Sequence, residues 1–233
     1  MNTQKRLGKI SGFTLVELMV VIGVLAVLMA LMIPGLNYAR KYASSAQCVQ
    51  NLRCMAAAIQ LYTVENDDRL PYALNGVTVY VQPDTDYLGS KIAPYMGYTL
   101  IPHKYMFIKE LICPGASKSL AEAKKANFIS YMVKDMYVPG VGTVFAFLSG
   151  ETYGGPHKSG MKMSFLASNA SGIKSVVKLS NGTTVDYVGG LSRVIAFHDY
   201  DTAYATSASY TVVDTMAHTK RNYLFFDWHV ESF

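Results

Sequence analysis

The stretch GFTLVELMVVIGVLAVLMALMIP, from Gly12 to Pro34, decides how the rest of this chain is interpreted. Its 21 residues from Phe13 to Ile33 carry a single charge, that of Glu17. A helix rises about 1.5 Å per residue, so a segment of this length reaches across the roughly 30 Å hydrocarbon core of a bilayer. The sequence therefore predicts a membrane-spanning helix with a carboxylate near its start.

The apolar residues are concentrated in this segment rather than spread along the chain. The chain has 233 residues, of which 51% are apolar and 16% are charged, which is lean in charge for a soluble domain. Its net charge is +5, and three basic residues (Lys5, Arg6 and Lys9) precede the apolar segment. Arg40 and Lys41 follow it, so the bias toward a cytoplasmic N-terminus is modest. Beyond residue 12 the charges nearly balance, and no nucleic-acid partner is expected.

Two simple interpretations of the apolar segment stay open. A secretory signal peptide has a basic start and an apolar core of about 7–15 residues, shorter than the core found here. Residues 43–46 could nevertheless imitate its small-residue cleavage site. A plain single-pass anchor fits the length but gives no reason for Glu17, because an acidic residue at mid-membrane costs on the order of 3 kcal/mol.

Glu17 gains a partner if the chain is cut between Gly12 and Phe13. The cut creates an α-amino group at Phe13, four residues before Glu17 and one helical turn away on the same face. The carboxylate can then pair with the amine of its own chain or of a neighbouring chain shifted by about one turn. In a low-dielectric bundle an unpaired carboxylate disfavours any other register. We therefore interpret Glu17 as the residue that sets the register of assembly.

The run from Lys5-Arg6 through Gly12-Phe13-Thr14-Leu15-Val16-Glu17 resembles the class III signal of type IV prepilins and type II secretion pseudopilins. Pro34 stands where that family has its helix-kinking proline. The resemblance implies cleavage after Gly12 by a prepilin peptidase, N-methylation of Phe13 and a role for Glu17 in assembly.

The same resemblance implies a non-enzymatic filament subunit. Its partners would be the prepilin peptidase, an inner-membrane assembly platform and other pilin or pseudopilin subunits in a helical filament. Before assembly it would lie in the inner membrane with its N-terminus cytoplasmic and its head periplasmic. Pilus and secretion pseudopilus, and major and minor subunit, stay open.

The expected fold is α+β and type IV pilin-like, with a long N-terminal helix and a C-terminal antiparallel β-sheet head. Residues 1–12 would be the leader, 13–33 the transmembrane and assembly helix, 34–68 an amphipathic helix and 69–233 the head. One helix of about 50 residues, kinked or briefly broken at Pro34, should end near Glu65–Asp68. Its packing stripe beyond the proline is Leu36, Ala39, Ala43, Ala46, Val49, Leu52, Ala56, Ile59 and Thr63.

The head sequence predicts strands separated by long loops. Strands are expected at 77–81, 128–133, 175–179, 183–188, 194–197, 223–226 and 229–233, with an apolar run at 105–112 and a short helix at 117–125. Residues 140–157 and 168–172 are rich in Gly and Ser and predict loops or weak strands. Asn181-Gly182 predicts a tight primed turn between two strands.

A second resemblance covers the head. It rests on Cys48, Asn51-Leu52, Tyr62, Asn66 to Pro71, Ile112-Cys113-Pro114, Ser130-Tyr131, and His218 with Phe226-Asp227-Trp228-His229-Val230. This set is similar to pilin-like proteins whose C-terminal motif is His, nine residues, then Asp-Gly. Here eight residues separate His218 from Asp227, and Trp228 replaces the Gly. If that Gly supplies a positive φ, the turn here changes type or the tip is reshaped.

Three cysteines lie beyond the apolar segment, so one thiol must stay unpaired within the chain. Cys48 and Cys54 are six residues apart on the expected helix and point to different faces. Cys48–Cys113 is the preferred disulfide, although the pairing is left open.

No cofactor is expected except a structural calcium ion, which the resemblance to major pseudopilins suggests. Its candidate ligands are Asp84, Asp86, Asp199 and Asp201. A zinc site could draw on His198, Asp199, Asp201, His218, Asp227 and His229, but neither HExxH nor EF-hand spacing occurs. The alternatives to the filament subunit are a membrane-anchored module that binds a glycan and a tethered metal-dependent enzyme.

Overall fold

The computed structural model describes residues 13–72, 76–78, 80–83, 87–114, 129–133, 135–140, 142–147, 160–179, 182–199 and 220–233. The chain separates into two compact units, residues 1–40 and 41–233. Helix α1 (Leu15–Glu65) has 51 residues, close to the length that the sequence predicts, and it contributes to both units.

In the first unit, α1 is apolar all round from Leu15 to Ile33 except at Glu17. Its large apolar side chains from Phe13 to Ile33 are each between 47% and 75% exposed. The helix continues through Pro34 without a break, and the kink expected there stays a prediction. A helix with no polar face needs lipid or other apolar helices around it.

In the second unit, α1 packs one face against the head. The buried residues of this face are Ser44, Cys48, Asn51, Leu52, Met55, Ala56, Ala58, Ile59 and Thr63. The predicted stripe is right from Leu52 onward and half-buried at Val49. It is wrong before that, because Leu36, Ala39, Ala43 and Ala46 are exposed. The buried face runs through Ser44 and Cys48 instead, because the disulfide described below turns Cys48 toward the head.

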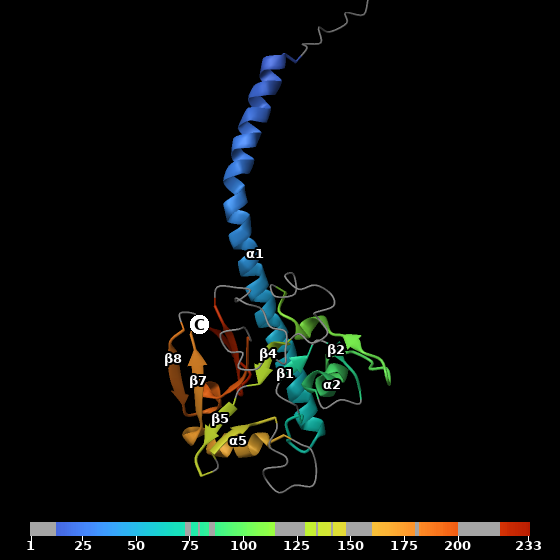
Figure 1. The fold of residues 1–233 in the computed structure, drawn as a ribbon, viewed down its shortest axis with the longest axis vertical. Coiled ribbons are helices and arrows are strands. Elements are labelled where there is room, and N and C mark those ends of the chain that lie inside the picture. The colour runs from blue at the N-terminus through green and yellow to red at the C-terminus, as the bar shows by residue number, and fades with distance from the viewer. Residues whose placement is uncertain are drawn as a thin grey trace, which may run out of the picture. The chain divides into compact units, whose positions relative to one another are not determined.

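The head is organised around a five-stranded antiparallel sheet with the order β1-β4-β9-β10-β11. Its strands are β1 (Gly76–Thr78), β4 (Ile129–Val133), β9 (Ile195–Asp199), β10 (Asn222–Phe225) and β11 (Val230–Ser232). Figure 1 labels its strands β1 and β4. Every residue of β9 and β10 is buried, so this part of the sheet is covered on both faces.

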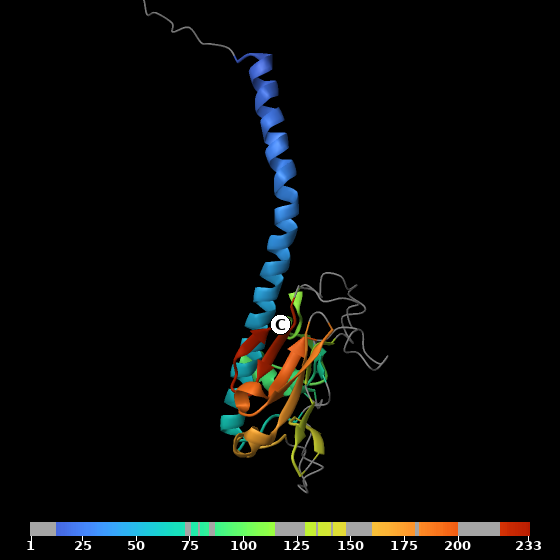
Figure 2. The same cartoon turned by 90° about the vertical axis from the view of Figure 1, so that its left-hand side faces the viewer.

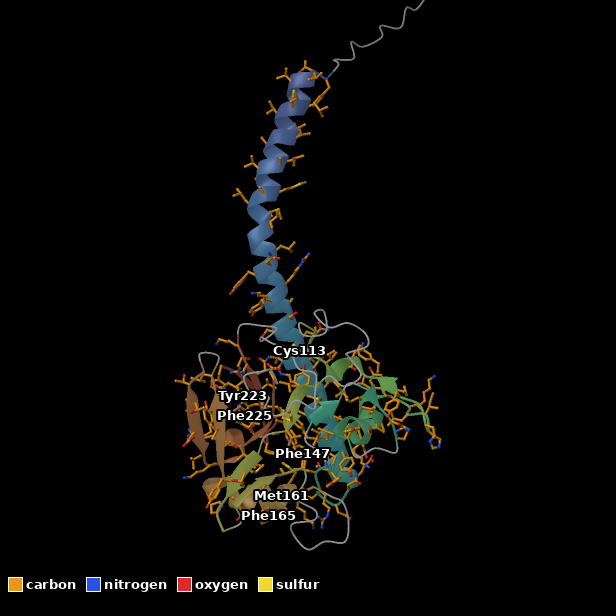
Figure 3. All side chains as sticks on the ribbon, in the orientation of Figure 1. Cys113, Phe147, Met161, Phe165, Tyr223 and Phe225 are labelled. Carbon is orange, nitrogen blue, oxygen red and sulfur yellow. A yellow bond between two sulfur atoms is a disulfide. The ribbon has the colours of Figure 1, made fainter. Side chains whose placement is uncertain are left out.

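A main core fills the space between α1 and one face of this sheet. Leu224 and Phe226 lie in it together with Phe197 and several of the buried α1 side chains. Phe147 (Figure 3) joins from the segment after β6, with its ring centroid 4.9 Å from that of Phe197 and 5.9 Å from that of Phe226.

A second antiparallel sheet, with the order β6-β5-β7-β8, covers the opposite face. Its strands are β5 (Asp135–Val138), β6 (Gly142–Phe145), β7 (Lys174–Lys178) and β8 (Thr184–Val188). Val177 of β7 packs with Ile195, Tyr223 and Phe225 in a smaller core. Both views show β7 and β8 (orange) beside β10 and β11 (red) (Figures 1 and 2).

Tyr223 also fastens the two sheets by hydrogen bonds. Its hydroxyl donates to the carbonyl of Lys178 at 2.6 Å and accepts from the N–H of Lys178 at 3.0 Å. Figure 3 labels Tyr223. Arg221 Nη1 donates to the carbonyl of Leu179 at 3.0 Å. The end of β7 is therefore held by two polar side chains from the neighbourhood of β10.

The remaining elements are short. They are β2 (Tyr80–Val81), β3 (Met106–Phe107), α2 (Leu88–Ile92), α5 (Met163–Asn169) and the 3-10 helices η1 (Ala93–Met96), η2 (Lys109–Leu111), η3 (Ala170–Gly172) and η4 (Leu191–Arg193).

Most of the predicted strands are present within one or two residues, and the α+β class is confirmed. The strand expected at 77–81 falls on β1 and β2, which belong to different sheets. Residues 168–172 are helical, not loop or weak strand, and α2, α5 and β5 were not expected. The helix expected at 117–125 lies outside the described residues.

A disulfide joins Cys48 of α1 to Cys113, with Cα atoms 5.3 Å apart, and this is the pair that the sequence favours. Cys54 is a free thiol. One turn along α1, the buried Asn51 donates from Nδ2 to the carbonyl of Ile112 at 2.9 Å. The segment before Pro114 is thus attached to α1 by one covalent bond and one hydrogen bond.

Asp68, just after α1, caps the distant helix α5. Its Oδ2 accepts from the N–H of Ser164 at 2.8 Å, across 96 positions of sequence, and its carbonyl accepts from the N–H of Met163 at 2.8 Å. Both donors are first-turn N–H groups that have no partner within the helix. Asp67 and Asp68 have φ angles of 52° and 63°, a conformation that Asp tolerates better than most residues.

Replacing both Cys48 and Cys113 by Ser should destabilise the head strongly. The bridge spans 65 positions, and the chain-entropy model gives about 4 kcal/mol for a loop of this size. Urea unfolding of the detergent-solubilised chain measures the change. Cys54→Ser is the matched control and should unfold like wild type; an unchanged midpoint in the double variant would contradict the prediction.

Asp68→Ala should cost about 2 kcal/mol, because it removes a capping acceptor and places Ala at a positive φ. Asp68→Asn keeps an acceptor and tolerates that φ, so it should cost only about 0.5 kcal/mol, the charge contribution. Urea unfolding at neutral pH measures both losses, and equal losses in the two variants would argue against the cap.

The cost of Asp68→Asn should also depend on pH. Two hydrogen bonds from Ser164 hold the pKa of Asp68 below its ordinary value of 3.8. The bond from the hydroxyl contributes more than the bond from the N–H. A lowered carboxyl pKa stabilises the folded state above the unfolded value, and this stabilisation is lost as the pH falls through the folded value. The stability difference between wild type and Asp68→Asn should therefore close in acid, and a gap that is constant with pH would contradict it.

Candidate assembly site

Thr14 and Glu17 form a reciprocal hydrogen-bonded pair at the start of α1. The N–H and the hydroxyl of Thr14 donate to Glu17 Oε2 at 2.8 and 2.9 Å, and the N–H of Glu17 donates to Thr14 Oγ1 at 3.3 Å. Since α1 begins at Leu15, Thr14 is the N-cap residue and Glu17 is the third helical residue. This is a capping box, in which two unpaired N–H groups are satisfied at once.

The capping role of Thr14 was not expected, although the signal was present. A Thr, two residues and a Glu immediately before an apolar run is the sequence signature of a capping box. The box gives Glu17 a partner within its own chain, whether or not the chain is cut before Phe13. Both bonds from Thr14 reach Oε2, and Oε1 accepts no hydrogen bond from the described residues, so a second donor can approach it.

The other residues of the expected processing site frame this box. Phe13 directly precedes Thr14 and its side chain is 75% exposed. Gly12 lies outside the described residues. Within the described part of the chain, α1 is the one helix whose length and composition would allow it to cross a membrane. A carboxylate thus lies at the positive end of that helix, one turn from the expected new N-terminus.

The expected calcium ligands fall mostly outside the described residues, which include Asp199 but not Asp84, Asp86 or Asp201. Asp199 is buried, and its Oδ2 accepts from both the backbone N–H and the side-chain amide of Asn222 at 2.8 Å. These bonds join the end of β9 to β10. No group of three or more His, Cys, Asp or Glu residues suited to a metal ion occurs in the described ranges.

The altered C-terminal motif forms the β10–β11 hairpin turn. Trp228 has a φ of 71°, its N–H donates to the carbonyl of Phe225 at 2.9 Å, and the N–H of Phe225 donates to the carbonyl of His229 at 3.0 Å. Trp228 therefore adopts the left-handed conformation itself, at a position that favours Gly. His218 lies outside the described residues.

The β7–β8 hairpin shows the same pattern with a Gly in that place. The N–H of Gly182 donates to the carbonyl of Leu179 at 3.0 Å, the N–H of Leu179 donates to the carbonyl of Thr183 at 2.8 Å, and φ of Gly182 is 87°. Asn181, the first residue of the expected primed turn, lies outside the described residues, so that turn stays a prediction. By analogy, Trp228 occupies a glycine position.

Comparison with known protein families matches residues 7–33 to the prokaryotic N-terminal methylation motif. A comparison with curated proteins and one with solved structures gave no match. The matched residues include Gly12, Phe13 and Glu17. The chain thus combines a prepilin-type signal with a pilin-like α+β fold, a long apolar N-terminal helix followed by antiparallel sheets. This points to a pilin or pseudopilin, a structural subunit rather than an enzyme.

Two variants at position 228 should separate backbone strain from side-chain packing. Trp228→Ala and Trp228→Gly both remove the ring, which packs at the edge of the main core, but only Gly relieves the positive φ. The Gly variant should therefore be more stable than the Ala variant by about 1 kcal/mol. Thermal unfolding should show this as roughly 2–4 °C for a domain of this size. Equal melting temperatures would mean that position 228 carries no strain.

Proposed function

We propose that this chain is a structural subunit of a type II secretion or type IV pilus-like filament, cut after Gly12 and methylated at Phe13. The observation that carries the proposal is the methylation motif over residues 7–33. The cut would be made by a prepilin peptidase, and assembly would use other pilin or pseudopilin subunits and an inner-membrane platform. The proposal includes membership of the pilin-like branch whose C-terminal motif is His, nine residues, then Asp-Gly.

The apolar part of α1 is the assembly element. Side chains exposed on every side suit a helix that is surrounded by lipid first and by other apolar helices later. Moving such a helix from lipid into a bundle changes its surroundings little, so association and dissociation are nearly balanced. Apolar packing alone also leaves the axial register of neighbouring helices poorly defined.

Glu17 supplies that register. In the filament its Oε2 keeps the bonds from Thr14, while Oε1 accepts from the methylated amine of Phe13 in the same or a neighbouring subunit. A register shifted by more than about a turn would leave an amine and a carboxylate unpaired in a low-dielectric bundle, at a cost of several kcal/mol.

The topology follows from the same elements. Residues 1–12 are the leader on the cytoplasmic side, 13–33 span the inner membrane, 34–68 continue as the amphipathic helix, and 69–233 form the periplasmic head. The disulfide between Cys48 and Cys113 supports this placement, because disulfides persist in an oxidising compartment such as the periplasm. Calcium and the glycan-binding alternative stay predictions.

Two single substitutions separate the register role of Glu17 from its capping role. Glu17→Gln keeps a side chain that can serve in a capping box but removes the charge. Thr14→Ala breaks the box but keeps the carboxylate. If the charge sets the register, Glu17→Gln should insert and be processed normally but enter filaments at least about tenfold less than wild type. Thr14→Ala should assemble with a much smaller loss.

The measurement is the amount of each variant in sheared filaments against the membrane pool, with mass spectrometry of the mature N-terminus. Wild type should begin at a methylated Phe13. A functional protein that still carries residues 1–12 would refute the processing. Normal incorporation of Glu17→Gln would refute the charge-based register.

A further inference from the structure

β8 is the terminal strand of its sheet, and within the described part of the chain it pairs with β7 alone. Hydrogen bonds alternate along an antiparallel pair, so their phase can be fixed from the two ends. Leu179 N–H donates to the Thr183 carbonyl at 2.8 Å, and Gly189 N–H donates to the Ile173 carbonyl at 3.5 Å.

With that phase, the backbone groups of Val185 and Tyr187 face β7. The N–H and C=O groups of Thr184, Asp186 and Val188 face the outer edge of the sheet. The strand therefore presents three outward donors and three outward acceptors along one edge.

Apart from the charge of Asp186, this edge lacks the usual features that prevent another strand from pairing with it. Natural edge strands are commonly interrupted by a Pro, a Lys or a bulge. The sequence of β8 is Thr-Val-Asp-Tyr-Val, and its five residues pair with Lys174–Lys178 in unbroken register. Apart from Asp186, its residues are β-branched or aromatic, types that favour strands.

An open cleft of about 440 Å³ lies along the same edge. Val185, Asp186 and Tyr187 line it from β8, Ser192 and Arg193 from η4, and His229 and Glu231 from the β10–β11 hairpin. Successive side chains of a strand point to opposite faces. Because three consecutive residues of β8 line this cleft, it follows the edge of the strand and not one of its faces.

The aromatic groups of the cleft are held in place from behind. The imidazole of His229 stacks on the ring of Phe225, with centroids 4.5 Å apart and planes 2° apart, and its Nδ1 contacts Asp227. The ring of Tyr187 lies 5.9 Å from that of Phe225 and 5.8 Å from that of Phe233. A wall that is ordered before binding lowers the entropy cost of binding.

The charges of the cleft favour a cationic ligand group. Asp186 and Glu231 are opposed by one guanidinium, that of Arg193. Glu231 Oε2 lies 3.8 Å from His229 Nε2. Burial first and the charge of Glu231 second raise the pKa of Tyr187, while the charge of Arg193 lowers it.

We propose that this cleft binds an extended peptide segment of a partner protein, which pairs with β8 as an added strand and places a Lys or Arg side chain beside Glu231. The backbone edge supplies affinity, and the carboxylate selects the side chain. The site goes beyond the proposed filament role, because it uses the head and not α1. Its failure and the failure of α1-driven assembly are therefore separate results.

Amide hydrogen exchange provides the direct test. The full chain in detergent is mixed with millimolar acetyl-Thr-Val-Lys-Val-Thr-Val-Lys-amide, and exchange is followed residue by residue by NMR. Strand addition should slow exchange at least about tenfold at Thr184, Asp186 and Val188, whose N–H groups face outward. Exchange at Val185 and Tyr187, already bonded to β7, should change little.

Two matched variants and two control peptides sharpen the test. Asp186→Pro removes an outward N–H without breaking a bond to β7, and should abolish the protection while the melting temperature shows that the head remains folded. Asp186→Asn keeps that N–H and should retain the protection. Glu231→Gln should weaken binding of the Lys peptide several-fold.

The same peptide with Glu in place of Lys should bind more weakly, and one with a central Pro should not protect the edge. The absence of protection at all three outward amides, or equal protection at the inward ones, would overturn strand addition. Stronger binding of the Glu peptide would overturn the assigned ligand class. Unchanged protection in a folded Asp186→Pro chain would also overturn the proposal.

Discussion

One continuous helix has to satisfy two different surroundings, and the rest of the structure depends on how α1 does this. Its first part has exposed apolar side chains on every side. Its second part has one buried face, fixed by the disulfide at Cys48 and the hydrogen bond from Asn51 to the carbonyl of Ile112. These two attachments set the rotation of the helix against the head. The main core then forms on the face that they turn inward.

The part of the sheet formed by β9 and β10 is buried on both sides, and the residues of β10 show this one by one. Leu224 and Phe226 belong to the main core, whereas Tyr223 and Phe225 belong to the smaller core under β7 and β8. A strand packed so closely on both faces leaves little freedom at its ends. This gives a reason why Trp228 keeps the left-handed conformation of the turn instead of relaxing it.

The sequence predicts what depends on local periodicity and misses what depends on distant partners. The length of α1 and most strands follow from apolar spacing. The burial of Ser44 does not, because Ser44 lies one turn before Cys48, whose disulfide partner is 65 positions away. Helix α5 was missed because its cap, Asp68, lies 96 positions before Ser164. At the assembly site, Glu17 was found because a charge in an apolar run is conspicuous, whereas Thr14 was overlooked although its capping signature is local.

The capping box and the proposed register role of Glu17 support each other. A free Glu side chain on a lipid-facing helix would sample many rotamers, and ordering it at the moment of assembly would cost free energy. Thr14 already holds one carboxylate oxygen at the helix start. In the proposed assembly step, the side chain of Glu17 is therefore ordered before a neighbouring subunit binds. In the proposed membrane-bound state before assembly, the same bonds satisfy the carboxylate. A single acidic residue can therefore be tolerated in an apolar helix and still be oriented toward an incoming amine.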